Sequence, residues 1–205
     1  MTTYADIRKM IEENDVEYID VRFTDPRGKL QHLAMCEHAM DEDAFNEGIL
    51  FDGSSIAGWK AINESDMLLV PDMDTAVMDP FTAQPQLIIF CDVKDPITGE
   101  FYSRDPRGTA KKAEQFVKDS GVGTDVFFGA EAVFFMFDDV RCSVEMIRSF
   151  FEFYSEEGPY ASGDEMEGGN MGHRPGVKGG YFPVNPIDQS GDIRAEMTST
   201  LLAMG

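Results

Sequence analysis

Apolar residues recur at two different spacings in the first half of the chain. Residues 4–13 place apolar side chains three and four positions apart with charged residues between them, which predicts a short amphipathic helix. Residues 16–23 and 29–35 are rich in strand-forming side chains and flank the turn sequence Asp-Pro-Arg-Gly, which predicts a hairpin. Residues 68–70 and 86–93 predict further strands, the second central in a sheet. We expect a small mixed sheet with one or two helices.

The second half begins with a well-marked helix. Asp105 stands at an N-cap position, proline follows at the first helical position and Gly121 stands where a helix would stop, so residues 106–120 are predicted to be helical. Residues 124–138 are rich in Phe and Val and predict a strand.

The end of the chain combines loops with one helix. Residues 158–186 carry so many glycines and prolines that loops should dominate them, and residues 192–204 predict a helix. We place a domain boundary near residue 103, which gives a sheet domain over 1–103 and a second domain over 104–205.

Glu131 is a lone carboxylate in the apolar segment. Alternate side chains of a strand share one face, so Glu131 would lie beside Val133 and Phe135. A buried carboxylate is costly unless it is paired or binds a metal, and Glu131 is therefore a candidate functional residue. The alternative is an exposed edge residue paired with a neighbouring Arg or Lys.

The chain is strongly acidic. Its 38 acidic and 17 basic residues give a formal net charge of −21, which argues against nucleic acid and anionic membrane surfaces as partners and favours a cationic substrate or counter-ion. The carboxylates are spread along most of the chain, so a solvated surface is the simpler interpretation of the charge.

The spacing of the cysteines and the hydropathy of the chain give evidence on the cellular location of the protein. Cys36, Cys91 and Cys142 are widely spaced and form no CxxC pattern, so neither a disulfide framework nor a zinc site is indicated. No apolar run approaches the roughly 20 residues of a membrane span, and residues 1–11 do not resemble a signal peptide. We therefore expect no membrane partner and a cytoplasmic location.

A polar loop is predicted between Phe51 and Trp59. Glycine and serine residues surround Asp52 in this stretch, as in exposed loops with a fixed tip, so the Asp52 carboxylate would be available to a cation. The alternative is a structural role in which Asp52 caps its own turn.

Two segments resemble the glutamine synthetase family. They are residues 51–69, FDGSSIAGWKAINESDMLL, and residues 172–184, GHRPGVKGGYFPV, in the family's order. The resemblance is to the type I-like enzymes. It implies an α+β fold in which a β-grasp-like mixed-sheet domain over 1–103 precedes the N-terminal part of an antiparallel-sheet catalytic domain over 104–205.

The resemblance also implies roles for individual residues. Asp52 and Ser55 match residues that reach into a neighbouring subunit's active site and help to bind and deprotonate ammonium. Tyr181 matches a residue of the ammonium pocket. Glu131 matches the first glutamate of a Glu-x-Glu pair that holds Mg²⁺ or Mn²⁺. The second glutamate is replaced by Val133, which offers no oxygen ligand, so one metal site is in doubt.

The activity implied is ATP-dependent ligation of ammonia to glutamate through a γ-glutamyl phosphate, a step of glutamine biosynthesis in nitrogen metabolism. The implied cofactors are ATP with Mg²⁺ or Mn²⁺, and the implied assembly is a ring-shaped homo-oligomer. Further metal ligands, the nucleotide-binding segment and the flap follow the region that this chain matches. We therefore expect a truncated chain that is inactive alone.

Two other hypotheses remain. The chain could be a non-catalytic short paralogue that binds full-length subunits or other partners through its sheet edge and the Asp52 loop, and Val133 favours this alternative slightly. An unrelated acidic metal-binding module is less favoured, because Glu131 would be its sole obvious ligand.

Overall fold

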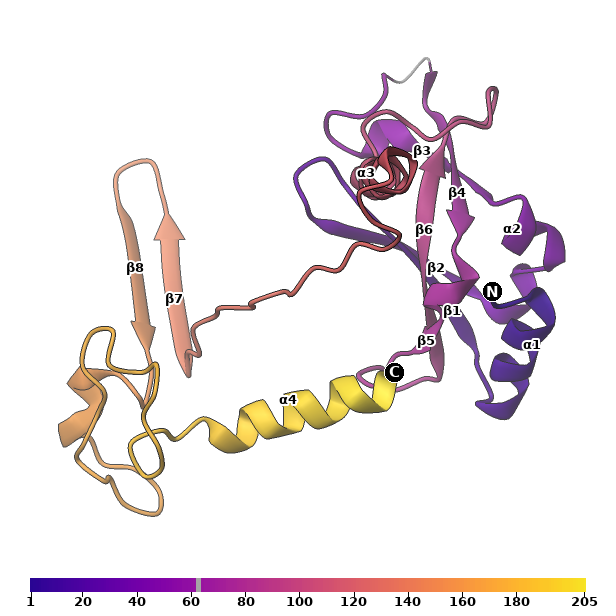
Figure 1. Ribbon diagram of the computed structural model, residues 1–205. Coiled ribbons are helices and arrows are strands. Elements are labelled where there is room, and N and C mark those ends of the chain that lie inside the picture. Colours follow the sequence, from indigo (N-terminus) through magenta and orange to yellow (C-terminus); the bar gives the residue numbers. More distant parts are fainter. Residues whose placement is uncertain (62–63) are drawn as a thin grey trace. The chain divides into compact units, whose positions relative to one another are not determined.

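The computed structural model describes residues 1–61 and 64–205, which form two compact units. The first unit comprises Met1–Phe128 with Met204–Gly205, and the second comprises Gly129–Ala203 (Figure 1). Residues 62–63, which belong to the first of the two family-like segments, lie outside the description. Within the described ranges, no helix is both long and apolar enough to cross a membrane.

The first unit is built on a six-stranded mixed sheet (Figure 1). Its strands are β1 (Tyr18–Thr24), β2 (Leu30–Cys36), β3 (Ile49–Asp52), β4 (Asp66–Pro71), β5 (Val77–Met78) and β6 (Gln86–Lys94). Their order is β2-β1-β6-β4-β3, and β5 also pairs with β6. Strand β1 is antiparallel to β2 and parallel to β6, while β4 is antiparallel to β6. The predicted hairpin, the mixed sheet and the central position of β6 are confirmed.

Local sequence signals account for the helices of this unit. Helix α1 (Tyr4–Glu13) begins at a reciprocal capping box between Thr3 and Asp6, and it buries Ile7 and Ile11. The short helix α2 (Glu42–Asn46) is capped by the side chain of Asp41. Helix α3 (Pro106–Ser120) begins after Asp105 and ends at Gly121, whose φ of 69° is left-handed. The predicted helices over 4–13 and 106–120 are confirmed.

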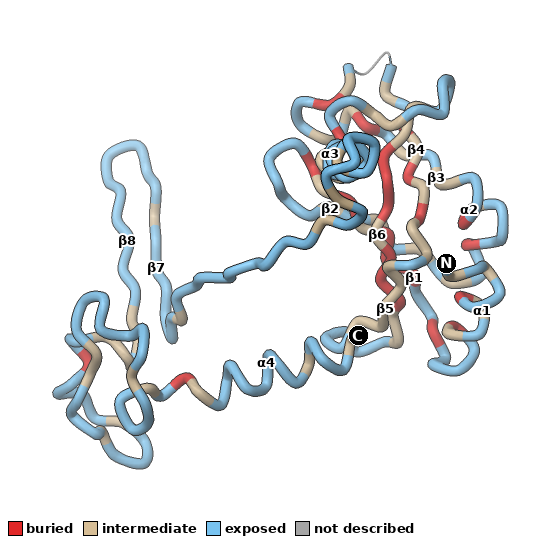
Figure 2. The backbone as a smooth tube through the Cα atoms, in the orientation of Figure 1, coloured by how far each residue is buried: buried red, intermediate tan, exposed pale blue. Residues whose placement is uncertain are grey.

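One face of the sheet carries the apolar core. Figure 2 shows buried residues gathered along the strands and on α1 and α2. The core contains Ile7, Ile11, Val16, Ile19, Val21, Phe23, Met40, Phe45, Trp59, Met67, Leu69, Leu87, Ile89, Cys91 and Val93. The strand residues of this set recur at alternate positions, as the period of two requires.

The opposite face of the sheet carries buried charged groups among apolar residues such as Ile88. Asp20 is fully buried on β1, and it accepts a 2.6 Å hydrogen bond from Nε of Arg22. The same guanidinium donates to Asp79 at 3.0 Å, and Nδ1 of His32 lies 2.5 Å from the other oxygen of Asp20. Each buried carboxylate of this group therefore has a charged or polar partner, which offsets the cost of its desolvation.

The second unit contains a hairpin, loops and a terminal helix. Strands β7 (Asp139–Val144) and β8 (Ser149–Tyr154) pair antiparallel, the short 3-10 helix η5 spans Pro159–Gly163, and α4 spans Gly191–Met204. The predicted final helix and the predominance of loops over 158–186 are confirmed. Only Ala161 and Ser190 are buried among the described residues of this unit.

The strand predicted over residues 124–138 is wrong. This segment contains no strand, because a strand needs a neighbour for its backbone N–H and C=O groups and none of the described strands pairs with it. Its aromatic side chains also lack a packing surface, since Phe127 and Phe128 are 91% and 93% exposed. The apolar composition suggested a buried strand, but composition alone supplies no partner.

Candidate functional site

The Asp52 loop starts at the end of an edge strand. Strand β3 pairs with β4 in a register that places Phe51 opposite Met67 and Asp52 opposite Asp66. The chain then enters a single 3-10 turn, η2 (Gly53–Ser55). The loop therefore departs from a point that the sheet fixes.

Asp52 organises the turn that follows it. Its Oδ1 accepts hydrogen bonds from the backbone N–H of Ser54 at 2.8 Å and from the Ser54 hydroxyl at 2.6 Å. Because both bonds stabilise the ionised form, with a smaller contribution from Ser65, the pKa of Asp52 lies below its usual range. Asp52 is exposed, as is Ser55 at the end of the turn. Asp52 thus caps its own turn and also presents a negative charge at neutral pH.

An aromatic cluster anchors both ends of this loop. The ring of Trp59 lies 6.0 Å from that of Phe51 and 5.5 Å from that of Phe23, measured between centroids. The hydroxyl of Tyr102 donates a 2.7 Å hydrogen bond to the carbonyl of Trp59. Trp59 itself is buried. The tip that carries Asp52 is therefore held between two packed aromatic residues.

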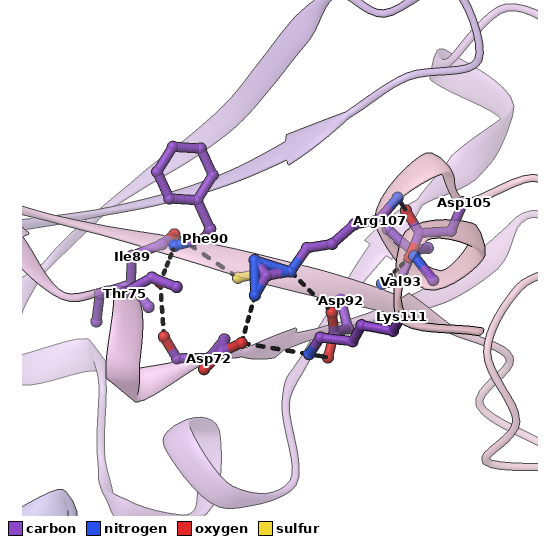
Figure 3. Close-up of polar contacts among 11 residues, drawn as sticks. Asp72, Thr75, Ile89, Phe90, Asp92, Val93, Asp105, Arg107 and Lys111 are labelled. Carbon is purple, nitrogen blue, oxygen red and sulfur yellow. Dashed lines mark hydrogen bonds and ion pairs between the residues drawn. The ribbon is translucent and has the colours of Figure 1, made fainter. Parts of the chain in front are cut away.

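A charged network joins α3 to the sheet (Figure 3). Arg107 donates to Asp92 at 3.0 Å and also pairs with Asp72, while Nζ of Lys111 lies 2.6 Å from Asp92 and 3.2 Å from Asp72. The two cations neutralise the two carboxylates, so the network is an internal connection rather than a free anionic site. The sequence carries no signal for this network, because Asp92 of β6 and Asp72, which follows β4, meet the cations of the helix only after the chain folds.

Asp105, which directly precedes α3, is buried. Its carboxylate accepts hydrogen bonds from the backbone N–H groups of Arg107 at 3.1 Å, Gly108 at 2.9 Å and Val93 at 3.2 Å (Figure 3). Burial nevertheless raises the pKa of Asp105. This residue caps α3 and ties it to β6.

The remaining predicted residues lie in the second unit. Tyr181 is 79% exposed, and its ring meets that of Phe182 edge-on at 4.5 Å. Glu131 is exposed rather than buried among apolar neighbours, and Val133 is 84% exposed. Among the described residues there is no group of three or more His, Cys, Asp or Glu side chains that could hold a metal ion. The structure thus brings Asp52 and Ser55 together in one loop, and it does not assemble a metal centre around Glu131.

A pocket of about 170 Å³ lies within the second unit. Its lining includes Asp138, Glu156, Glu157 and Gln189. None of the residues predicted from the sequence to act in a site lines it, and Asp138 already accepts a 2.8 Å hydrogen bond from the backbone N–H of Glu156.

Two family models match the chain in succession. The model described as the beta-Grasp domain of glutamine synthetase matches residues 15–96, and the model described as the catalytic domain of glutamine synthetase matches residues 103–205. The β-grasp match falls on the mixed sheet of the first unit. The α+β fold expected from the sequence is confirmed.

Individual relatives agree with these matches. A glutamine synthetase of Azospirillum brasilense is 58% identical over 205 residues, which are 100% of this chain and 44% of that protein. A glutamine synthetase of Rhizobium meliloti (strain 1021) is 57% identical with the same shares. A cryo-EM structure of Plasmodium falciparum glutamine synthetase matches the fold with a TM-score of 0.78 at 23% identity, covering 100% of this chain and 40% of that chain. The chain spans less than half the length of these relatives, and it belongs to the glutamine synthetase family.

Proposed function

We propose that this chain supplies the ammonium-binding loop and the beginning of the catalytic domain of a glutamine synthetase. The reaction is ATP-dependent ligation of ammonia to glutamate through a γ-glutamyl phosphate. The observation that carries the proposal is the match along the whole chain at 58% identity, combined with an exposed, ionised Asp52 on an anchored loop.

Asp52 is suited first to binding a cation. A carboxylate attracts NH4⁺ electrostatically and can accept its proton when ammonia forms. In the observed loop the hydrogen bonds from Ser54 keep the pKa of Asp52 low, which favours binding over proton acceptance. Enclosure of the loop at a subunit interface would raise that pKa by desolvation and make Asp52 a better base. Ser55 and Tyr181 complete the proposed ammonium pocket.

This chain carries only one glutamate of the family's metal-binding Glu-x-Glu pair. Glu131 offers the oxygen ligand that Mg²⁺ and Mn²⁺ prefer, whereas Val133 offers none. No complete cluster of metal ligands occurs in the described residues, so these residues do not fit a divalent metal site by themselves. No residue among those described is assigned to ATP binding. We infer that residues 1–205 alone are inactive.

The same proposal covers organisation and assembly. We place the domain boundary near residue 103, which is supported by the two family matches ending at residue 96 and starting at residue 103. We propose a ring-shaped homo-oligomer in which the Asp52 loop of one subunit meets the active site of the next, with glutamate, ammonium and ATP as ligands. We propose a cytoplasmic location for it.

A non-catalytic paralogue that binds full-length synthetase subunits is the second candidate. Val133 at a metal-ligand position favours it. The two candidates differ when the chain is mixed with an intact synthetase: a binding paralogue co-elutes with the synthetase or changes its activity. Absence of both effects removes this candidate.

The ammonium role is tested in a chimera that joins this chain to the part of the A. brasilense synthetase that it does not match. Asp52→Asn should lower kcat/KM for ammonium by about 10²-fold or more, because the charge and the proton acceptor are both lost. The control is Asp95→Asn, since Asp95 caps a different turn through the backbone N–H groups of Ile97 and Thr98. Equal ammonium dependence in both variants contradicts the role of Asp52.

A further inference from the structure

We infer that Met67 is a positioning residue for Asp52, because its buried thioether packs against the backbone of Gly53 and holds the start of the Asp52 loop. This inference deepens the proposed function and rests on Asp52 being the ammonium-binding carboxylate. It concerns a residue on β4 that lies one position from the strand partner of Asp52.

Gly53 has no space for a side chain. A Cβ built at this position would overlap the Sδ atom of Met67, and it would lie 2.7 Å from Cγ of Met67 and 3.1 Å from the carbonyl oxygen of Ser65. Met67 is fully buried, so it has no adjacent solvent into which it can move. Gly53 is not among the residues with a positive φ. Glycine is therefore required here by packing rather than by backbone conformation.

The position of the Asp52 carboxylate depends on this packing. The Asp52 side chain is exposed, and its main hydrogen bonds are to Ser54, two residues away, with a smaller contribution from the side chain of Ser65. The bonds from Ser54 set the local direction of the carboxylate, whereas the contribution of Ser65, the residue before β4, depends on the position of the turn. The turn is held by the 2.7 Å hydrogen bond from the N–H of Gly53 to the carbonyl of Ser65, and the side chain of Met67 lies against Gly53 at the same point. A shift at Gly53 would therefore displace the adjacent carboxylate.

The experiment uses the 205-residue chain and four variants. They are Gly53→Ala, Met67→Ala, the double variant of both, and Met67→Leu, with Gly129→Ala as a control at a glycine that has open space. NMR measures hydrogen exchange of the amide at position 53 and the titration of the Asp52 carboxyl carbon. Asp66, which faces Asp52 across the strands, is titrated at the same time to identify any coupling between the two carboxyls.

Asp95 provides the internal control. Its pKa is also lowered, because the backbone N–H groups of Thr98 and Ile97 donate to it in a separate turn of the same unit. A change confined to the Asp52 loop leaves the titration of Asp95 unchanged, whereas general loosening of the sheet shifts both residues.

We expect Gly53→Ala and Met67→Ala each to speed amide exchange at position 53 and to raise the pKa of Asp52 toward its usual range. The double variant should return both quantities toward wild type, because the added methyl group occupies space vacated by the thioether. Met67→Leu, which conserves volume, should stay near wild type. Wild-type exchange or wild-type titration of Asp52 in Gly53→Ala, or two single effects that simply add, would overturn the inference.

If Gly53→Ala does not fold, the comparison of Met67→Ala with Met67→Leu tests the positioning role of Met67. Loss of the low pKa of Asp52 in Met67→Ala alone supports the positioning role, and identical behaviour of the two variants overturns it. The NMR result does not depend on catalysis, so it is separable from the ammonium role. That role fails independently if Asp52→Asn leaves the ammonium dependence of the chimera unchanged.

Discussion

The aspartates that cap helices α2 and α3 should differ strongly in their contribution to stability. Asp105 is fully buried and accepts hydrogen bonds from Arg107 and Gly108 of α3 and from Val93 of β6. Asp41 is exposed and caps the short helix α2 through one hydrogen bond, 2.9 Å long, from Ala44. Substituting each residue with alanine therefore compares a buried connection with a simple cap.

The magnitudes follow from the groups left without partners. Loss of an N-cap costs about 0.5–2 kcal/mol, and one further unsatisfied buried N–H, that of Val93, costs about 1–3 kcal/mol. Burial raises the pKa of Asp105, which means that the buried charge itself costs stability, and the alanine variant no longer carries this cost. We therefore expect Asp105→Ala to lower the free energy of unfolding by about 2 kcal/mol in total. Asp41→Ala should cost about 0.5–1 kcal/mol.

The assay is urea unfolding followed by the fluorescence of Trp59, the one tryptophan of the chain, which is buried in the first unit. With an m-value of about 2 kcal/mol/M, Asp105→Ala should lower the unfolding midpoint by about 1 M, and Asp41→Ala by less than half of that. A midpoint for Asp105→Ala that is no lower than that of Asp41→Ala would refute the assigned role of the buried carboxylate.

Three further predictions concern pH, thiol reactivity and metal binding. The pKa of Asp25 is lowered chiefly by a hydrogen bond from the side chain of Gln31, with smaller contributions from backbone N–H groups of its turn, and the pKa of Asp95 is lowered by backbone N–H groups of Thr98 and Ile97. Their contribution to stability is therefore present above the usual value of 3.8 and is lost as pH falls through their lower folded values. Substituting both with asparagine should flatten the loss of stability in acid, measured by urea midpoints, and an unchanged slope contradicts this. Burial raises the pKa of the Cys91 thiol, so a thiol reagent should modify only the two exposed cysteines of the native chain, as read by mass spectrometry; modification of Cys91 at the same rate speaks against its burial. In the chimera, Val133→Glu should tighten Mn²⁺ binding measured by calorimetry if Glu131 is a metal ligand, and unchanged affinity removes Glu131 from that role.

The parts of the fold that local signals control were predictable from the sequence. Helix α3 begins after Asp105 and ends at Gly121 because the capping side chain and the left-handed glycine act within one turn of the helix. The β1–β2 hairpin follows in the same way from its turn residues. These features need no knowledge of distant contacts.

Features that depend on a distant partner were not predictable. Residues 124–138 have the composition of a strand, yet no described strand pairs with them. The β7–β8 hairpin was not predicted from the sequence, and the two strands of this hairpin pair only with each other. The network of Asp72 and Asp92 with the cations of α3 arises only when β4, β6 and the helix meet.

The candidate site likewise has one part that was predictable from the sequence and one part that was not. The Asp52 loop was located from its sequence, and its turn proved to be organised by Asp52 itself. The contact between Gly53 and Met67 had no sequence signal, because it joins the η2 turn to β4, which lies beyond the loop. The roles of Asp52, Ser55, Glu131 and Tyr181 stay predictions.

The most direct test measures glutamine formation from glutamate, ATP and ammonium by the chain alone and by its chimera with the unmatched part of the A. brasilense synthetase. We expect no product from the chain alone and ammonium-dependent glutamine from the chimera. Glutamine made by the 205-residue chain alone, or a folded and assembled chimera that makes none, would contradict the proposed function.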